Sequence, residues 1–160
     1  MANGILYGIR RVGDPILSTT ARDVDDPLSS DTQLLTMRLA TLLEAMGDGT
    51  IGLAAPQIGA SLRVFVMNIP TEAGGDGTTH AYINPEILEA SQETETDTEG
   101  CLSCDGTYIV ERPKWIVGTW AGIDGQRYEQ RFDGLAARCF QHEHDHLNGL
   151  LITRFQRVAG

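Results

Sequence analysis

The chain has 160 residues, a net charge of −10 and three cysteines. This length predicts one domain that spans residues 1–160, and the acidic charge argues against direct binding to nucleic acids or anionic membranes. Three cysteines cannot form a full disulfide framework, and neither a signal-peptide pattern nor a long apolar run is present, so we expect a cytoplasmic protein.

Two regular elements are predicted in the first half of the chain. Ser30 and Gln33 form a capping box ahead of an amphipathic helix that ends at Gly47. The apolar run at residues 63–68 is typical of a buried strand. Residues 71–79 contain three glycines and are expected to form a flexible loop.

The second half is predicted to contain a hairpin and then a helix. An acidic run at residues 93–99 precedes Cys101 and is expected to be a solvated loop. Asp124 and Gly125 predict a tight turn between strands at residues 115–121 and 127–132. Strands and helices in this order indicate a mixed α+β domain.

A single helical face is predicted near the carboxyl end of the chain. Leu135, Cys139, His142 and His146 fall at positions i, i+4, i+7 and i+11, and Gly149 stands where a left-handed residue would end the helix. The two histidines therefore continue an apolar face and are expected to point into the protein.

Histidines four residues apart on one helix face can bind the same metal ion. Glu143 is placed beside His142 and His146 to handle the proton of a bound water, as in other His-Glu-x-x-His sites. His144 is expected to be a solvated surface residue. Asp145 is either a group that supports a metal ligand or only a surface charge.

A third ligand must come from upstream, because residues 150–160 contain no His, Asp, Glu or Cys. Cys139 lies seven residues before His146, about 10 Å along the helix axis, which is too far for one shared ion. Cys101, Cys104, His80 or a carboxylate remain as candidates.

Three segments of the chain resemble the motifs of the peptide deformylases, in that family's order. They are residues 52–59, 99–103 and 141–149. Residues 9–15 and 83–85 resemble two further family segments, so the likeness covers nearly the whole chain. It implies small antiparallel sheets packed around a central helix that carries the His-Glu-x-x-His motif, and metal-dependent removal of the formyl group from N-formylmethionyl peptides.

The resemblance also implies a role for each site residue. The expected metal ligands are Cys101, His142 and His146. Glu143 would act as the catalytic base, and the side-chain amide of Gln57 with the backbone N–H of Leu102 would stabilise the oxyanion. Five residues are expected to line the substrate site: Thr50, Ile51, Gly52, Leu135 and Cys139. For Gly52 we expect a close approach of the substrate backbone.

The expected cofactor is one divalent metal ion. A mixed cysteine and histidine set is compatible with Zn²⁺, Fe²⁺, Co²⁺ or Ni²⁺, and the resemblance favours Fe²⁺. The expected partner is an N-formylated peptide, bound by a monomer. No local basic patch is visible, so any ribosome contact would be transient. Residues 150–160 are short for the helical tail of many family members, and we expect no role for such a tail.

Three positions depart from the family pattern. Cys104 and Asp105 stand where an aliphatic residue and a proline are usual, and Thr50 stands where glycine is common. Cys104 is expected to pack as a small apolar residue, although a redox pair with Cys101 or a structural zinc site are alternatives. Thr50 and Asp105 are expected to border the substrate and to weaken the use of formylmethionyl peptides.

These departures leave two alternative functions open. The first is a deformylase-like hydrolase that acts on another N-formyl or small amide substrate. The second is a catalytically silent protein that binds formylated peptides, although Glu143 and Gln57 argue against silence.

Overall fold

The computed structural model describes residues 8–159, so the first residues, where the sequence shows no signal-peptide pattern, lie outside the described range. Within this described range the α-helices are α2 (Ser30–Ala45) and α3 (Gly134–Leu147). The strands are β1 (Gly52–Ala54), β2 (Val64–Met67), β3 (His80–Ala90), β4 (Thr94–Cys101), β5 (Cys104–Pro113), β6 (Trp115–Ala121), β7 (Arg127–Asp133) and β8 (Gln156–Arg157). Short 3-10 helices cover Pro15–Ser18, Ala55–Ile58, Thr71–Ala73 and Ile152–Arg154.

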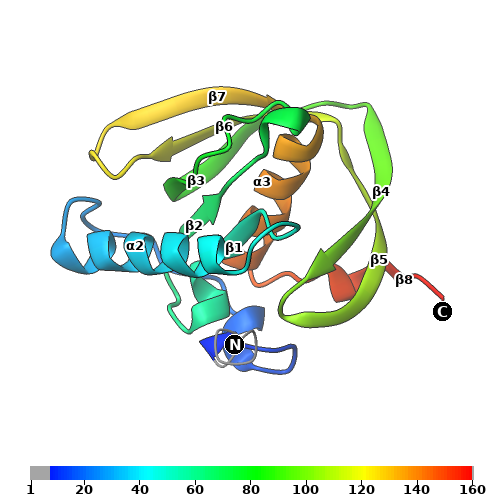
Figure 1. Cartoon of the computed structure of the whole chain (residues 1–160), viewed down its shortest axis with the longest axis horizontal. Helices are drawn as coiled ribbons and strands as arrows, with labels where there is room; N and C mark the ends of the chain where they lie inside the picture. The colour runs from blue at the N-terminus through cyan, green and yellow to red at the C-terminus, as the bar shows by residue number, and fades with distance from the viewer. Residues whose placement is uncertain (1–7, 160) are drawn as a thin grey trace.

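The strands form two antiparallel sheets, one with the order β1-β2-β3-β6-β7 and one with the order β4-β5-β8. Helix α3 packs between them, in contact with β1, β2, β6 and β7 on one side and with β5 on the other (Figure 1). Helix α2 covers β1, β2 and β3 from outside. The expected α+β fold, with small antiparallel sheets around a central helix, is confirmed.

Helix α3 is held in the middle by an aromatic core. Phe140 is fully buried and packs edge-on against Phe65 and Tyr82, with ring centroids 5.0 and 5.7 Å away. Gly118 on β6 makes room for it, because a Cβ there would lie 2.8 Å from Phe140 Cζ. This face of α3 thus packs on β2, β3 and β6, whereas the face that carries the two histidines points toward the end of β4.

The N-cap of helix α2 is one residue earlier in the chain than predicted. Ser29 is the N-cap, and its Oγ accepts from the Thr32 N–H at 3.2 Å. The expected capping box of Ser30 and Gln33 is therefore wrong, since the Gln33 amide donates to the carbonyls of Pro27 and Ile123 instead. The end of the helix agrees with the prediction, because Gly47 follows the C-cap with φ +71°.

The predicted strand at residues 63–68 and the predicted hairpin at residues 115–132 are confirmed. The solvated loop expected at residues 93–99 is wrong, because most of it is strand β4, paired with β5. The first five residues of β4 are exposed, but Glu99 is buried. The loop at residues 71–79 starts with the short helix Thr71–Ala73, and its flexibility stays a prediction. No helix within residues 8–159 is long and apolar enough to cross a membrane.

Candidate metal centre and active site

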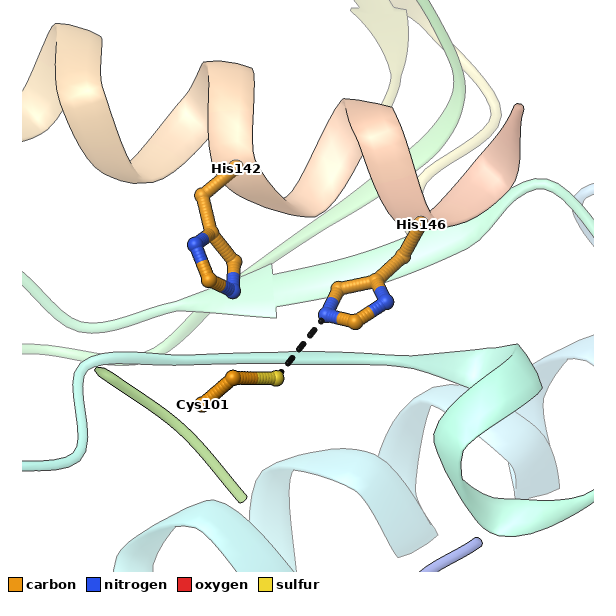
Figure 2. Close-up of side chains that lie close together, drawn as sticks. All are labelled: Cys101, His142 and His146. Carbon is orange, nitrogen blue, oxygen red and sulfur yellow. Dashed lines mark hydrogen bonds between the residues drawn. The ribbon is translucent and has the colours of Figure 1, made fainter. Parts of the chain in front are cut away.

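Three potential metal ligands meet between α3 and the end of β4. The ligand atoms of Cys101, His142 and His146 all lie within 4.8 Å of one another. Both imidazoles project from one side of α3 toward Cys101, with Cys101 Sγ 3.5 Å from His146 Nε2 (Figure 2). One ion with bonds of about 2.0–2.3 Å can bind thiolate and imidazole ligands at such separations. The donor set therefore fits a single divalent metal.

The other upstream candidates for the third ligand lie elsewhere. His80 stands at the start of β3 and pairs with Asp76, with 2.7 Å between Nε2 and Oδ2, and both residues line a different hollow from Cys101. Cys104 faces Cys101 across the β4–β5 turn, but it is buried among Tyr108, Val110 and Ile152. Cys104 thus packs as a small apolar residue, as expected, and the described cysteines are all free thiols.

Glu99 orients the first histidine. Its Oε1 accepts from His142 Nδ1 at 2.8 Å, which leaves Nε2 of that ring for a metal. Arg112 binds both Glu99 oxygens at 2.6 and 2.9 Å, and Arg138 binds Oε2 at 2.7 Å. Sequence reasoning missed these three residues, although Glu99 opens the cysteine motif and stands two residues before Cys101.

Asp145 belongs to the same network but does not touch a histidine. Its Oδ2 accepts from Arg112 Nη1 at 2.9 Å and from Arg154 Nη2 at 3.0 Å. Asp145 is therefore linked to His142 through Arg112 and Glu99. His144 is not a solvated surface residue as expected. It is half-buried and stacked on the Phe140 ring, because α3 is covered by sheets on both sides.

The charges of this cluster follow from burial and pairing. Burial alone would raise the pKa of Glu99, but hydrogen bonds from Arg112 and His142 hold it well below its usual range. Burial lowers the pKa of His146 well below its usual value, so its imidazole is neutral and able to bind a metal.

Glu143 lies on α3 between the two histidines and is buried. Its Oε2 has no hydrogen-bond partner within the described part of the chain. Burial raises the pKa of this carboxyl to about 7. A carboxylate whose pKa lies near neutrality is suited to both accepting and returning a proton.

Gly52 on β1 lets Glu143 occupy this position. A Cβ at residue 52 would lie 2.6 Å from Glu143 Oε1 and 2.9 Å from Cys139 Sγ. Sequence reasoning attributed this glycine to a close approach of substrate, whereas here the close neighbours are side chains of α3.

Replacing Gly52 by Ala is expected to lower kcat/KM at least about tenfold, because the new methyl group would displace the Glu143 carboxylate from its place beside the candidate metal ligands. Gly8→Ala is the matched control, since the space around its Cβ is open within 4 Å and Gly8 does not line the neighbouring pocket. Steady-state rates of formate release measure both variants, and equal losses in the two would contradict this explanation.

A pocket of about 500 Å³ opens beside these groups. Ten of the eleven predicted site residues line it: Thr50, Ile51, Gly52, Gln57, Cys101, Leu102, Leu135, Cys139, His142 and Glu143. The exception is His146, which does not line the pocket and is 2 % exposed. Asp105 is absent from the pocket lining, and its side chain is 84 % exposed. Thr50 therefore borders this pocket and Asp105 does not, and their effect on the choice of substrate stays a prediction.

Gln57 is fixed in place at the side of the pocket. Its Oε1 accepts from the Ala54 N–H at 2.9 Å. Its Nε2 donates to Ser103 Oγ at 3.1 Å and lies 3.6 Å from Cys101 Sγ. The amide N–H groups thus point toward the cysteine, where a donor could meet a bound carbonyl.

A larger hollow of about 920 Å³ lies between α2, β3 and β7, lined by Trp120 and Tyr128. None of the predicted site residues lines it. We therefore assign the functional site to the smaller pocket, because it contains the cluster of Cys101, His142 and Glu143, and not to the larger hollow.

Comparison with known proteins agrees with this geometry. A family model described as "Polypeptide deformylase" matches residues 6–158. The chain belongs to the polypeptide deformylase family. A peptide deformylase of Thermotoga maritima is 43 % identical over 150 residues, which cover 92 % of this chain and 85 % of the relative. "Peptide deformylase 2" of Corynebacterium efficiens is 40 % identical over 162 residues, with 92 % and 80 % covered.

Solved deformylase structures have the same fold. The crystal structure from Thermotoga maritima matches with a TM-score of 0.85 and 38 % identity, over 95 % of this chain and 98 % of that one. The structure from Ehrlichia chaffeensis in complex with actinonin matches with a TM-score of 0.84 and 32 % identity, over 92 % and 87 %. The chain is thus a metal-dependent hydrolase that removes the N-formyl group from nascent peptides, as in the first of the expected functions.

Proposed function

We propose that one divalent metal ion, Fe²⁺ in the native protein, is held by Cys101, His142 and His146 for the deformylation of N-formylmethionyl peptides. The observation that supports this assignment is the convergence of three ligand atoms within 4.8 Å, beside the buried Glu143. An ion bound there would supply an activated water and polarise the formyl carbonyl. The thiolate ligand needs a reducing compartment, which agrees with a cytoplasmic monomer that forms one catalytic domain.

Glu143 transfers the proton in this proposal. Its carboxylate takes a proton from the attacking water and delivers it to the amine nitrogen as the C–N bond of the formamide breaks, which releases formate. The buried setting keeps its pKa near 7, so both directions of transfer are accessible at neutral pH.

Gln57 and Leu102 stabilise the oxyanion that forms on the formyl oxygen. The Gln57 amide and the Leu102 backbone N–H both border the pocket next to Cys101. Replacing Gln57 by Ala is expected to lower kcat by about 10²–10³-fold, which corresponds to the loss of one oxyanion donor. We expect KM to change little, and Gln130→Ala on the exposed face of β7 serves as the control. A change in KM alone would exclude an oxyanion role.

The pocket walls bind the methionyl side chain and the peptide backbone. Ile51, Leu135 and Cys139 supply apolar surface, and Thr50 contributes a hydroxyl at the edge. The related Ehrlichia chaffeensis protein binds actinonin. Formyl-Met-Ala-Ser and formyl-Gly-Ala-Ser test this assignment, and kcat/KM is expected to be higher for the methionyl peptide. Equal values would favour a different N-formyl substrate.

Metal identity is tested by reloading chelator-treated protein with Fe²⁺, Zn²⁺, Co²⁺ or Ni²⁺ under nitrogen. Co²⁺ reports the ligand set, because a cobalt–thiolate bond gives a charge-transfer absorption that Cys101→Ser should remove. Cys139→Ser should keep this absorption. If it persists in Cys101→Ser, the assignment of the thiolate ligand is wrong.

A further inference from the structure

We propose that Arg11 is a positioning residue that fixes the relative positions of the two oxyanion donors, Gln57 and Leu102. This inference rests on the proposed function, because it assumes that these two groups act on the formyl oxygen. Arg11 does not line the substrate pocket, so its effect must pass through the loops that it contacts.

The amino-terminal segment around Arg11 connects the two donor loops. The Arg10 N–H donates to the Gln57 carbonyl at 2.7 Å, and the Val12 N–H donates to the Ser103 carbonyl at 2.8 Å. In Figure 1 this segment, drawn in blue, lies at the tip of the β4–β5 hairpin. One short stretch of backbone therefore fixes the distance between the Gln57 loop and the Leu102 turn.

The Arg11 side chain adds a second restraint on the turn. Its Nη1 donates to the Leu102 carbonyl at 2.6 Å, and its Nη2 binds Asp105 Oδ1 at 2.5 Å. The planar guanidinium thus spans the turn from Leu102 to Asp105, a geometry that an ammonium group cannot reproduce. Asp105, which stands where the family usually has proline, acquires a role as the partner of Arg11.

This restraint acts on rate more than on stability. Arg11 and Asp105 are 51 % and 84 % exposed, and exposed ion pairs contribute little to folding free energy. The Leu102 N–H and C=O belong to peptide groups joined at one Cα, so fixing the carbonyl limits rotation of the N–H. An oxyanion donor must be held within about 0.5 Å of its productive position, so greater mobility of this turn is expected to lower kcat.

The test compares Arg11→Met, Arg11→Lys and a matched control, Arg131→Met. Arg131 also forms an exposed ion pair, with Asp133 at 3.1 Å, but on β7 away from the turn. Deformylation of formyl-Met-Ala-Ser by the Ni²⁺-loaded enzymes gives kcat and KM. Metal content is measured on the same samples, and the ¹⁵N order parameter of the Leu102 amide is measured on Zn²⁺-loaded samples, because Zn²⁺ is diamagnetic and leaves this amide signal sharp.

For Arg11→Met we expect kcat to fall about tenfold, with KM within about twofold and one metal per chain retained. The Leu102 order parameter should drop from the rigid range of about 0.85 toward about 0.6. Arg11→Lys should recover part of the loss, and Arg131→Met should match the wild type in all readouts.

Three results would overturn the proposal. They are an unchanged Leu102 order parameter in Arg11→Met, a rise in KM without a fall in kcat, and loss of the metal, which would show that Arg11 secures Cys101 instead. If the wild type releases no formate, the proposed function fails. The order parameter still decides in that case whether Arg11 holds the turn.

Discussion

Replacement of Glu143 by Gln is expected to lower kcat for formate release by about 10²–10⁴-fold while one metal ion per chain stays bound. Gln keeps the shape of the side chain but cannot accept a proton, and none of the three ligands changes. Glu111→Gln, on the exposed face of β5, is the control and should retain full activity. A Glu143→Gln enzyme with more than a tenth of wild-type turnover would exclude Glu143 as the base.

The same substitution is expected to stabilise the metal-free protein at alkaline pH. The pKa of Glu143 is raised to about 7 by burial, from an ordinary value of 4.5. The folded state therefore binds this proton more tightly than the unfolded state, and wild-type stability falls as pH rises through about 7. Chemical denaturation of chelator-treated protein at pH 8 should show Glu143→Gln more stable by about 1–3 kcal/mol. The gain should shrink at pH 5, and a pH-independent gain would contradict this account.

Loss of the Glu99 carboxylate is expected to have the second large effect. Glu99→Ala leaves Arg112 and Arg138 without their buried partner and His142 without its acceptor. Removing one partner of a buried ion pair costs about 3–5 kcal/mol of folding free energy. Loss of a group that orients a metal-binding histidine weakens metal affinity by about 10–100-fold.

Urea denaturation and metal competition measure these two quantities for Glu99→Ala. Glu93→Ala is the matched control, because Glu93 also pairs with a cation, Lys114, but its side chain is 74 % exposed. This exposed pair should be worth less than about 1 kcal/mol. If the two variants lose equal stability, the buried network is not a main source of stability.

The contribution of Glu99 also depends on pH, with the opposite sign to that of Glu143. Its folded-state pKa lies well below the ordinary value of 4.5. Its stabilisation is therefore fully present above about pH 4.5 and is lost as the pH falls toward the folded-state pKa. Glu99→Gln should show a shallower loss of unfolding free energy between pH 5 and pH 3 than the wild type. A parallel decline would contradict the assignment.

Local periodicity predicted only the parts of the site that lie on one element. His142 and His146 share a face of α3 because they are four residues apart, and this spacing can be read directly from the sequence. Cys101 lies 41 residues before His142 in the chain, and it is the pairing of the strands that brings it next to the two histidines. For this reason it was identified by resemblance to the family motif and not by spacing.

The missed residues depend on partners from other elements. Glu99 is the last member of an acidic run, and its burial follows from arginines on β5 and α3. The link between Arg11 and Asp105 spans 94 residues, so no local pattern indicates it. His144 was misplaced because helical spacing alone does not show that both faces of α3 are covered.

The most direct test is formate release from formyl-Met-Ala-Ser by protein purified without oxygen and loaded with Fe²⁺ or Ni²⁺. We expect rapid release at one metal per chain, none after chelation, recovery on reloading, and none from Glu143→Ala. No release by wild-type protein that holds one metal ion per chain would contradict the central claim that this centre is a deformylase.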